Sequence, residues 1–145
     1  MRLTPVSLCA LLRFLHLVSI TLEAKVDESF GPTVKAWLEN ASVGKKKKLV
    51  FLRENLGLMD KVLDNIRYQL FHRTVSALLE AKHFNARYAM MIVHSFSPAK
   101  SGFDDYQAFL GLFGQSAQAG NLVELHIGGT PRLFSGWISE KGALS

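Results

Sequence analysis

The stretch VSITLEAKVD, residues 18–27, decides the fold, because apolar and polar side chains alternate through it without a break. This alternation is the period of a β-strand with one buried face, since successive side chains point to opposite sides of a sheet. One face then carries Glu23, Lys25 and Asp27, with about 6–7 Å between next-but-one residues. These charges are either solvated or part of a site. The side chains expected to face the core are those of Val18, Ile20, Leu22, Ala24 and Val26.

Length and composition predict one globular domain. The chain has 145 residues, of which 48% are hydrophobic and 20% charged, so it is long enough to bury a core. We expect a variable N-terminal segment over residues 1–17 and a single α/β domain over residues 18–145. The net charge of +5 permits a polyanionic partner without requiring one.

The N-terminal residues 1–17, MRLTPVSLCALLRFLHL, contain an apolar stretch that Arg13 and His16 interrupt. No small-x-small cleavage site precedes Glu23, so a secretory signal is disfavoured. The apolar run is far shorter than the roughly 20 residues that cross a bilayer, so no membrane partner is expected. The single cysteine, Cys9, cannot form an intramolecular disulfide, and we expect a cytoplasmic protein.

The remaining pattern predicts helices alternating with strands. Residues 33–38 and 49–56 favour short helices, and residues 60–83 carry the longest helical pattern. YAMMIVHS, residues 88–95, is a continuous apolar run, which is typical of a central strand covered on both faces. A further helix is followed by a hairpin of residues 122–127 and 132–138. The fold class is therefore α/β, with a mixed sheet flanked by helices and a C-terminal β-hairpin.

Two groups of polar residues are candidates for binding phosphate. Four consecutive lysines either form a solvated helix start or contact a polyanion. Three polar residues of the long helical pattern lie three or four apart and share one helix face, where they either contact phosphate or are hydrated. The candidate nucleic-acid-binding residues are Lys45, Lys46, Lys47, Lys48, Gln69, His72 and Arg73.

The order of elements around Glu23-Ala24-Lys25 resembles the PD-(D/E)XK nuclease superfamily, whose core runs helix, three strands, helix, strand. Glu-x-Lys matches the second motif of that superfamily. Four longer segments together look like one uncharacterised prokaryotic family within it, and the resemblance spans residues 18–137. These segments are LEAKVDESFGP, RYQLFHRTVSALLEA, MIVHSFSP and FDDYQAFLGLFG.

The resemblance implies an incomplete restriction-endonuclease-like core and metal-dependent hydrolysis of a phosphodiester. In such sites the Glu of Glu-x-Lys and an Asp hold Mg²⁺, which activates the attacking water, and the Lys orients that water. Glu23 and Lys25 are thus the implied catalytic residues, and Gln69 matches a glutamine found on the following helix. Glu23 and Asp27 are the candidate magnesium ligands.

One departure from the superfamily pattern bears on all of these expectations. The first Asp of the superfamily lies on the strand before Glu-x-Lys, yet residues 1–22 contain no carboxylate. The resemblance therefore implies an N-terminally shortened or rearranged copy with poor magnesium affinity. Missing strands would leave an exposed sheet edge, through which the chain could form a homo-oligomer.

The expected function is that of a degenerate or truncated nuclease-like domain whose ancestral substrate is nucleic acid. Whether such a chain is still an enzyme stays open at this point. The alternative is a non-catalytic module that binds DNA or another nucleic acid, or that binds a protein.

Overall fold

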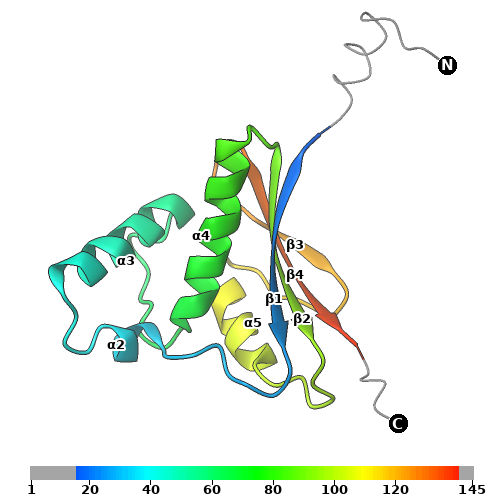
Figure 1. Ribbon diagram of the computed structural model, residues 1–145, viewed down its shortest axis with the longest axis horizontal. Coiled ribbons are helices and arrows are strands. Elements are labelled where there is room, and N and C mark those ends of the chain that lie inside the picture. Colours follow the sequence, from blue (N-terminus) through cyan, green and yellow to red (C-terminus); the bar gives the residue numbers. More distant parts are fainter. Residues whose placement is uncertain (1–15, 141–145) are drawn as a thin grey trace, which may run out of the picture.

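The protein is described by a computed structural model that covers residues 16–140. Helices and strands follow one another in a mixed α/β order, and the helices lie against one side of a sheet (Figure 1). The predicted variable segment, residues 1–17, lies almost entirely outside the described residues. In chain order the elements are β1 (Val18–Lys25), α2 (Val34–Trp37), α3 (Val43–Leu56), α4 (Tyr68–His83), β2 (Tyr88–Ser95), α5 (Phe103–Gly111), β3 (Leu122–Leu125) and β4 (Arg132–Ser139).

The strands form a four-stranded mixed sheet in the order β1-β2-β4-β3. β2 pairs in parallel with both β1 and β4, and β3 pairs antiparallel with β4. The predicted mixed sheet, its flanking helices and the C-terminal hairpin are therefore confirmed. β1 is an edge strand of the described sheet, and Glu23 lies opposite Val93 of β2.

The expected orientation of β1 is wrong. Ile20 and Leu22 are 56% and 58% exposed, whereas Glu23 and Lys25 are 7% and 4% exposed. The reason is that α4 and α5 cover one face of the sheet, as Figure 1 shows, and β1 turns its polar residues toward that face. Alternation correctly predicted two faces, but the apolar one is the face without a helix among the described residues.

The central strand β2 is covered by helices on one face and not, as predicted, on both. Met91 and Val93 face the helices and are completely buried. Met90 and His94 point to the other face and are only half-buried, because no described helix lies there (Figure 1). Ile92 is nevertheless buried on that face, beside Gly136 of β4.

The long helix α4 begins at Tyr68, eight residues later than the apolar spacing predicted. Leu63 and Ile66 are buried, but they lie in turns that are bound to the start of α2. The Val34 amide donates to the Ile66 carbonyl at 2.8 Å, and the Tyr68 amide donates to the Pro32 carbonyl at 3.1 Å. These bonds hold the first turn of α4 beside the segment that follows β1.

The core lies between the helices and the sheet and is rich in aromatic rings. Trp137 of β4 is completely buried and packs against Tyr106 and Phe103 of α5, with ring centroids 5.5 and 5.1 Å apart. The Tyr106 hydroxyl forms a 2.9 Å hydrogen bond with Ser135, and burial raises the pKa of Tyr106 to about 12. This packing fixes β4 against α5.

Among the helices of residues 16–140, none combines the length and the apolar character that a membrane crossing needs.

Candidate functional site

A buried polar cluster joins the end of β1 to the first turns of α4. Glu23 Oε1 accepts a hydrogen bond from Gln69 Nε2 at 2.9 Å and lies 3.1 Å from Lys25 Nζ. Glu23 Oε2 lies 2.7 Å from Arg73 Nε. One carboxylate is thus held by an amide and two cations, so the cluster of Glu23, Lys25, Gln69 and Arg73 has a formal charge of +1.

The ammonium of Lys25 has an acceptor for each of its three protons. Besides the Glu23 carboxylate, it donates to Gln69 Oε1 at 3.0 Å and to the Ser29 carbonyl at 3.2 Å. Its nitrogen also lies 5.0 Å from the centre of the Phe30 ring, a distance at which a cation and a ring attract one another. A buried charge is stable only with such partners, so Lys25 is fixed in position.

The spacing of these residues along the strand and along the helix explains why they meet. Glu23 and Lys25 are two apart on a strand and therefore share a face. Gln69 and Arg73 are four apart on a helix and share a face as well, which packs over β1. Arg67 fixes the approach to α4, because it donates to the Gly31 carbonyl at 2.8 Å and pairs with Asp105 at 3.2 Å.

Asp27 lies apart from the buried cluster. β1 ends at Lys25, and Asp27 follows it as an exposed residue in a bend, so the strand period no longer directs its side chain. Within residues 16–140, no three His, Cys, Asp or Glu side chains come together as metal ligands would. Since both oxygens of Glu23 already meet cations or an amide, the residues present do not fit Mg²⁺, which binds carboxylates and waters.

The four lysines begin α3, where Ser42 Oγ caps the helix by accepting from the Lys45 amide at 3.2 Å. All four are exposed, but only Lys45 and Lys48, three residues apart, share a helix face. Lys45 Nζ lies 5.2 Å from the centre of the Trp37 ring. Lys46 and Lys47 point in other directions.

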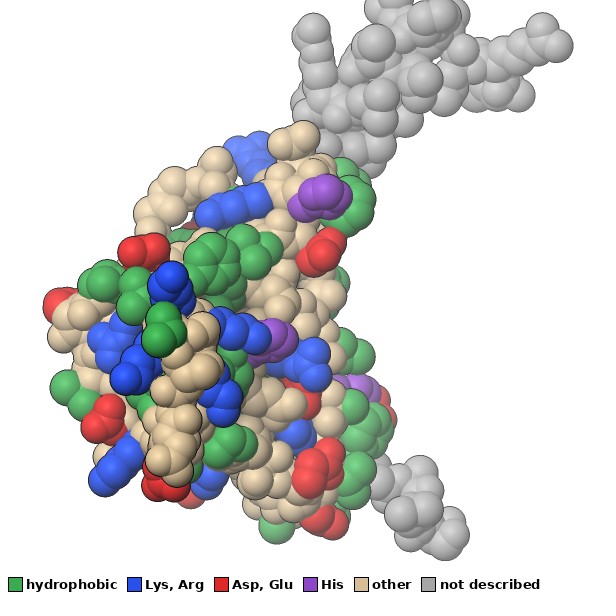
Figure 2. Space-filling view, turned by 60° about the vertical axis from the view of Figure 1, so that its left-hand side comes forward, with side chains coloured by type: hydrophobic (Ala, Val, Ile, Leu, Met, Phe, Trp, Pro, Cys, Tyr) green, Lys and Arg blue, Asp and Glu red, His purple; other side chains and the backbone are tan. Residues whose placement is uncertain are grey.

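His72 marks the place where positive charges converge. Burial holds the pKa of His72 below its ordinary value of 6.5, and the charges of Lys48 and Arg73 lower this pKa further. Figure 2 shows Lys and Arg side chains gathered on the side of the molecule that α2 and α3 form. Of the sequence-predicted cations, Lys45 and Lys48 of α3 and Arg73 of α4 therefore act on one region.

This region contains a hollow of about 380 Å³ beside the buried cluster. Its lining includes Lys25, His72 and Arg73, together with aromatic rings that the sequence interpretation missed. Trp37 and Tyr68 stack with ring centroids 3.9 Å apart and 9° between the planes. Trp37 lies in none of the segments that carry the resemblance, and Tyr68 lies in RYQLFHRTVSALLEA without an assigned role. Only the contact of α2 with the start of α4 brings the two rings together. The lining residues are Lys25, Ser29, Phe30, Gly31, Pro32, Trp37, Tyr68, Gln69, His72 and Arg73.

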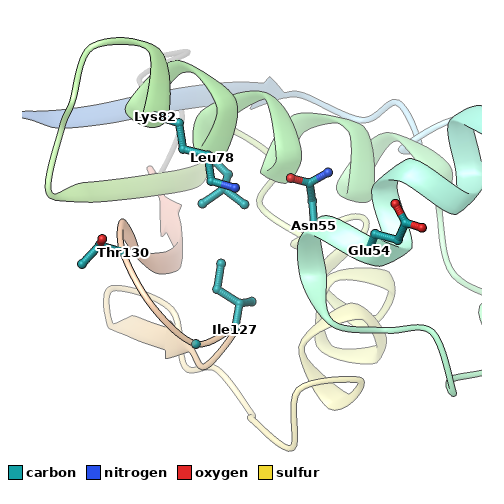
Figure 3. A pocket seen from close by; sticks show the side chains of 7 residues that line it. Glu54, Asn55, Leu78, Lys82, Ile127 and Thr130 are labelled. Atoms are coloured by element: carbon teal, nitrogen blue, oxygen red, sulfur yellow. The ribbon is translucent and has the colours of Figure 1, made fainter.

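A second hollow, of about 310 Å³, lies between α3, α4 and the loop that joins β3 to β4 (Figure 3). Glu54 and Asn55 reach it from α3, Lys82 from α4, and Thr130 from the loop. It contains none of the predicted site residues, and its single carboxylate and single ammonium form no ion pair. The hollow beside Glu23 is therefore the candidate site.

The chain belongs to the family described as Domain of unknown function (DUF6946), whose model matches residues 8–142. The match covers both β1 and α4, so the residues of the buried cluster all lie within the family domain. Comparison with curated proteins finds no match. Comparison with solved structures finds none either.

Proposed function

We propose that this domain is a degenerate nuclease-like module that binds nucleic acid at the hollow beside β1 and α4 without cleaving it. The observation that carries this proposal is the single carboxylate of Glu23 between the cations of Lys25 and Arg73. A site with this charge balance attracts a phosphate group, whereas a magnesium site needs the opposite balance. No step through a metal is included in this proposal.

Further cations near the hollow support the same proposal. The charges of Lys48 and Arg73 both act on His72, and Lys45 lies over the Trp37 ring. Cations spread over α3 and α4 suit successive phosphates of one strand, because each contact releases condensed counterions. Affinity is then expected to fall steeply as the salt concentration rises.

The test is the binding of fluorescein-labelled DNA by fluorescence anisotropy over a series of salt concentrations. The logarithm of the wild-type association constant should fall linearly as the logarithm of the salt concentration rises. At each salt concentration, EDTA should leave the affinity unchanged. Lys48→Gln should weaken binding and reduce the slope by about 0.7–0.9, the loss of one phosphate contact. The matched control is Lys47→Gln, which removes the same charge from another face of α3 and should have the smaller effect.

Two outcomes would contradict this proposal. One is the absence of any salt-sensitive binding. The other is an equal effect of Lys47→Gln and Lys48→Gln, which would show that the net charge of the protein, and not this site, accounts for the binding.

The absence of cleavage is tested directly on plasmid DNA with Mg²⁺ or Mn²⁺, because Gln69 bonds to both Glu23 and Lys25. These are the three residues that the PD-(D/E)XK resemblance names. Wild type, Glu23→Ala and Lys25→Ala should be equally inert. Cutting by wild type that both substitutions abolish would replace the binding proposal by a catalytic nuclease.

A further inference from the structure

The lining of the hollow combines two kinds of side chain. Lys25 and Arg73 supply positive charge, and the stacked rings of Trp37 and Tyr68 form what we call the aromatic wall. A volume of about 380 Å³ falls within the range of about 300–1,000 Å³ that is usual for small-ligand sites. A ligand that fits both the cations and the rings combines a flat ring with a negative charge.

The aromatic wall is fixed before any ligand arrives. Trp37 ends α2 and Tyr68 begins α4, and backbone contacts tie the two elements together. Thr33 and Arg67 form an isolated antiparallel bridge, next to the 2.8 Å bond from the Val34 amide to the Ile66 carbonyl. Both stacked rings are half-buried, and the part that stays exposed is held in place before a ligand binds, at little cost in lost side-chain motion.

We infer that the hollow takes one unpaired nucleobase of a single-stranded nucleic acid, packed on the aromatic wall while the adjoining phosphate meets Arg73. This inference rests on the proposed function and adds the substrate class. A base in a duplex has its faces covered by neighbouring pairs, whereas an unpaired base has a face free for an aromatic ring. The aromatic wall therefore favours single-stranded over double-stranded nucleic acid.

The experiment compares a single-stranded deoxyoligonucleotide of about twelve nucleotides with the same strand annealed to its complement. Wild type should bind the single strand at least about tenfold more tightly. Trp37→Ala should weaken single-strand binding by about 5- to 100-fold, the effect of one lost base stack, and leave duplex binding unchanged. Trp37→Phe should retain most of the affinity.

Two controls separate stacking from misfolding. Phe84→Ala removes an aromatic side chain that is 61% exposed at the other end of α4, and it should not change the affinity. Trp137, the other tryptophan of the chain, is completely buried and reports folding by its fluorescence in each Trp37 variant.

The outcomes distinguish this inference from the proposed function. Equal affinity for single strand and duplex, with no effect of Trp37→Ala, would overturn the inference and leave salt-dependent binding intact. Binding of a mononucleotide such as AMP without binding of the oligonucleotide would assign the hollow to a free nucleotide and overturn the single-strand inference. Absence of all binding would overturn the proposed function itself.

Discussion

Glu23 is a buried carboxylate held by three side chains. It is 7% exposed and meets Lys25, Gln69 and Arg73, and of these the Arg73 side chain is 42% exposed. An exposed ion pair would contribute about 0–1 kcal/mol to the free energy of unfolding, but a buried pair that loses one member leaves an uncompensated charge. Residues of the candidate site are therefore expected to stabilise the fold.

The first prediction concerns the substitution Glu23→Gln, which keeps the shape of the side chain and removes its charge. Lys25 and Arg73 would then lie close together without a counter-charge, so the free energy of unfolding should fall by about 2–3 kcal/mol. Urea denaturation measures this change. Glu28→Gln, at an exposed carboxylate just past β1, is the control and should change the value by less than about 0.5 kcal/mol. Equal stability of both variants would show that the cluster does not stabilise the fold.

The second prediction concerns the pH dependence at His72. The pKa of His72 in the folded chain lies below 6.5, chiefly through burial, and the unfolded chain takes up its proton first as the pH falls. The stability that neutral His72 contributes is complete above pH 6.5 and is lost as the pH falls from there through the folded pKa. In His72→Gln the free energy of unfolding should lack this part of its decrease at acid pH. Urea denaturation of both proteins at a series of pH values measures the difference.

NMR titration of the His72 ring gives an independent measurement. A bound polyanion shields the ring from the charges of Lys48 and Arg73, so its pKa should rise when DNA is added. An unchanged His72 pKa in a saturated complex would place the bound DNA elsewhere on the protein.

At the scale of elements, β1 shows what an alternating pattern can and cannot predict. Alternation separates residues 18–25 into two sets, but it does not reveal which set meets the helices. Which set is buried depends on the face of the sheet that α4 covers. Gln69 and Arg73 of α4 contact Glu23, so α4 covers the face that carries the polar residues of β1. The site residues of β1 were predictable as a set, but their burial was not.

The third prediction follows from the orientation of β1. Leu22→Thr should change the free energy of unfolding by less than about 1 kcal/mol, because Leu22 is 58% exposed and Thr suits a strand. Val93→Ala, at a completely buried position of the neighbouring strand β2, should cost about 2–3 kcal/mol. Urea denaturation compares the two. A larger loss for Leu22→Thr would mean that the apolar face of β1 is covered in solution.

The start of α4 was mispredicted for a different physical reason. Leu63 and Ile66 have helical spacing, but the segment that contains them forms backbone bonds with residues 34 and 35 instead of continuing the helix. Local spacing does not report such non-local bonds. The error of eight residues leaves Gln69, His72 and Arg73 on one helix face, so the predicted grouping of these three residues holds.

At the scale of the whole molecule, alternating helices and strands predicted an α/β fold with a mixed sheet. The parallel pairing of β1 with β2 was not predicted, and it is reached through the helices that connect the two strands. The sequence did not reveal that β4, and not β3, lies beside β2. Nor did it reveal the aromatic wall, because Trp37 and Tyr68 meet only when α2 lies against the start of α4. Residues joined by topology alone leave no local pattern.

The buried cluster also bears on how this family changes over evolutionary time. Glu23, Lys25, Gln69 and Arg73 fasten an edge strand to the longest helix of the described chain, so a substitution at any of them weakens the attachment. Selection for folding alone is sufficient to retain them. A Glu-x-Lys motif maintained across relatives would therefore record the need to attach this strand to this helix as readily as it would record a catalytic role.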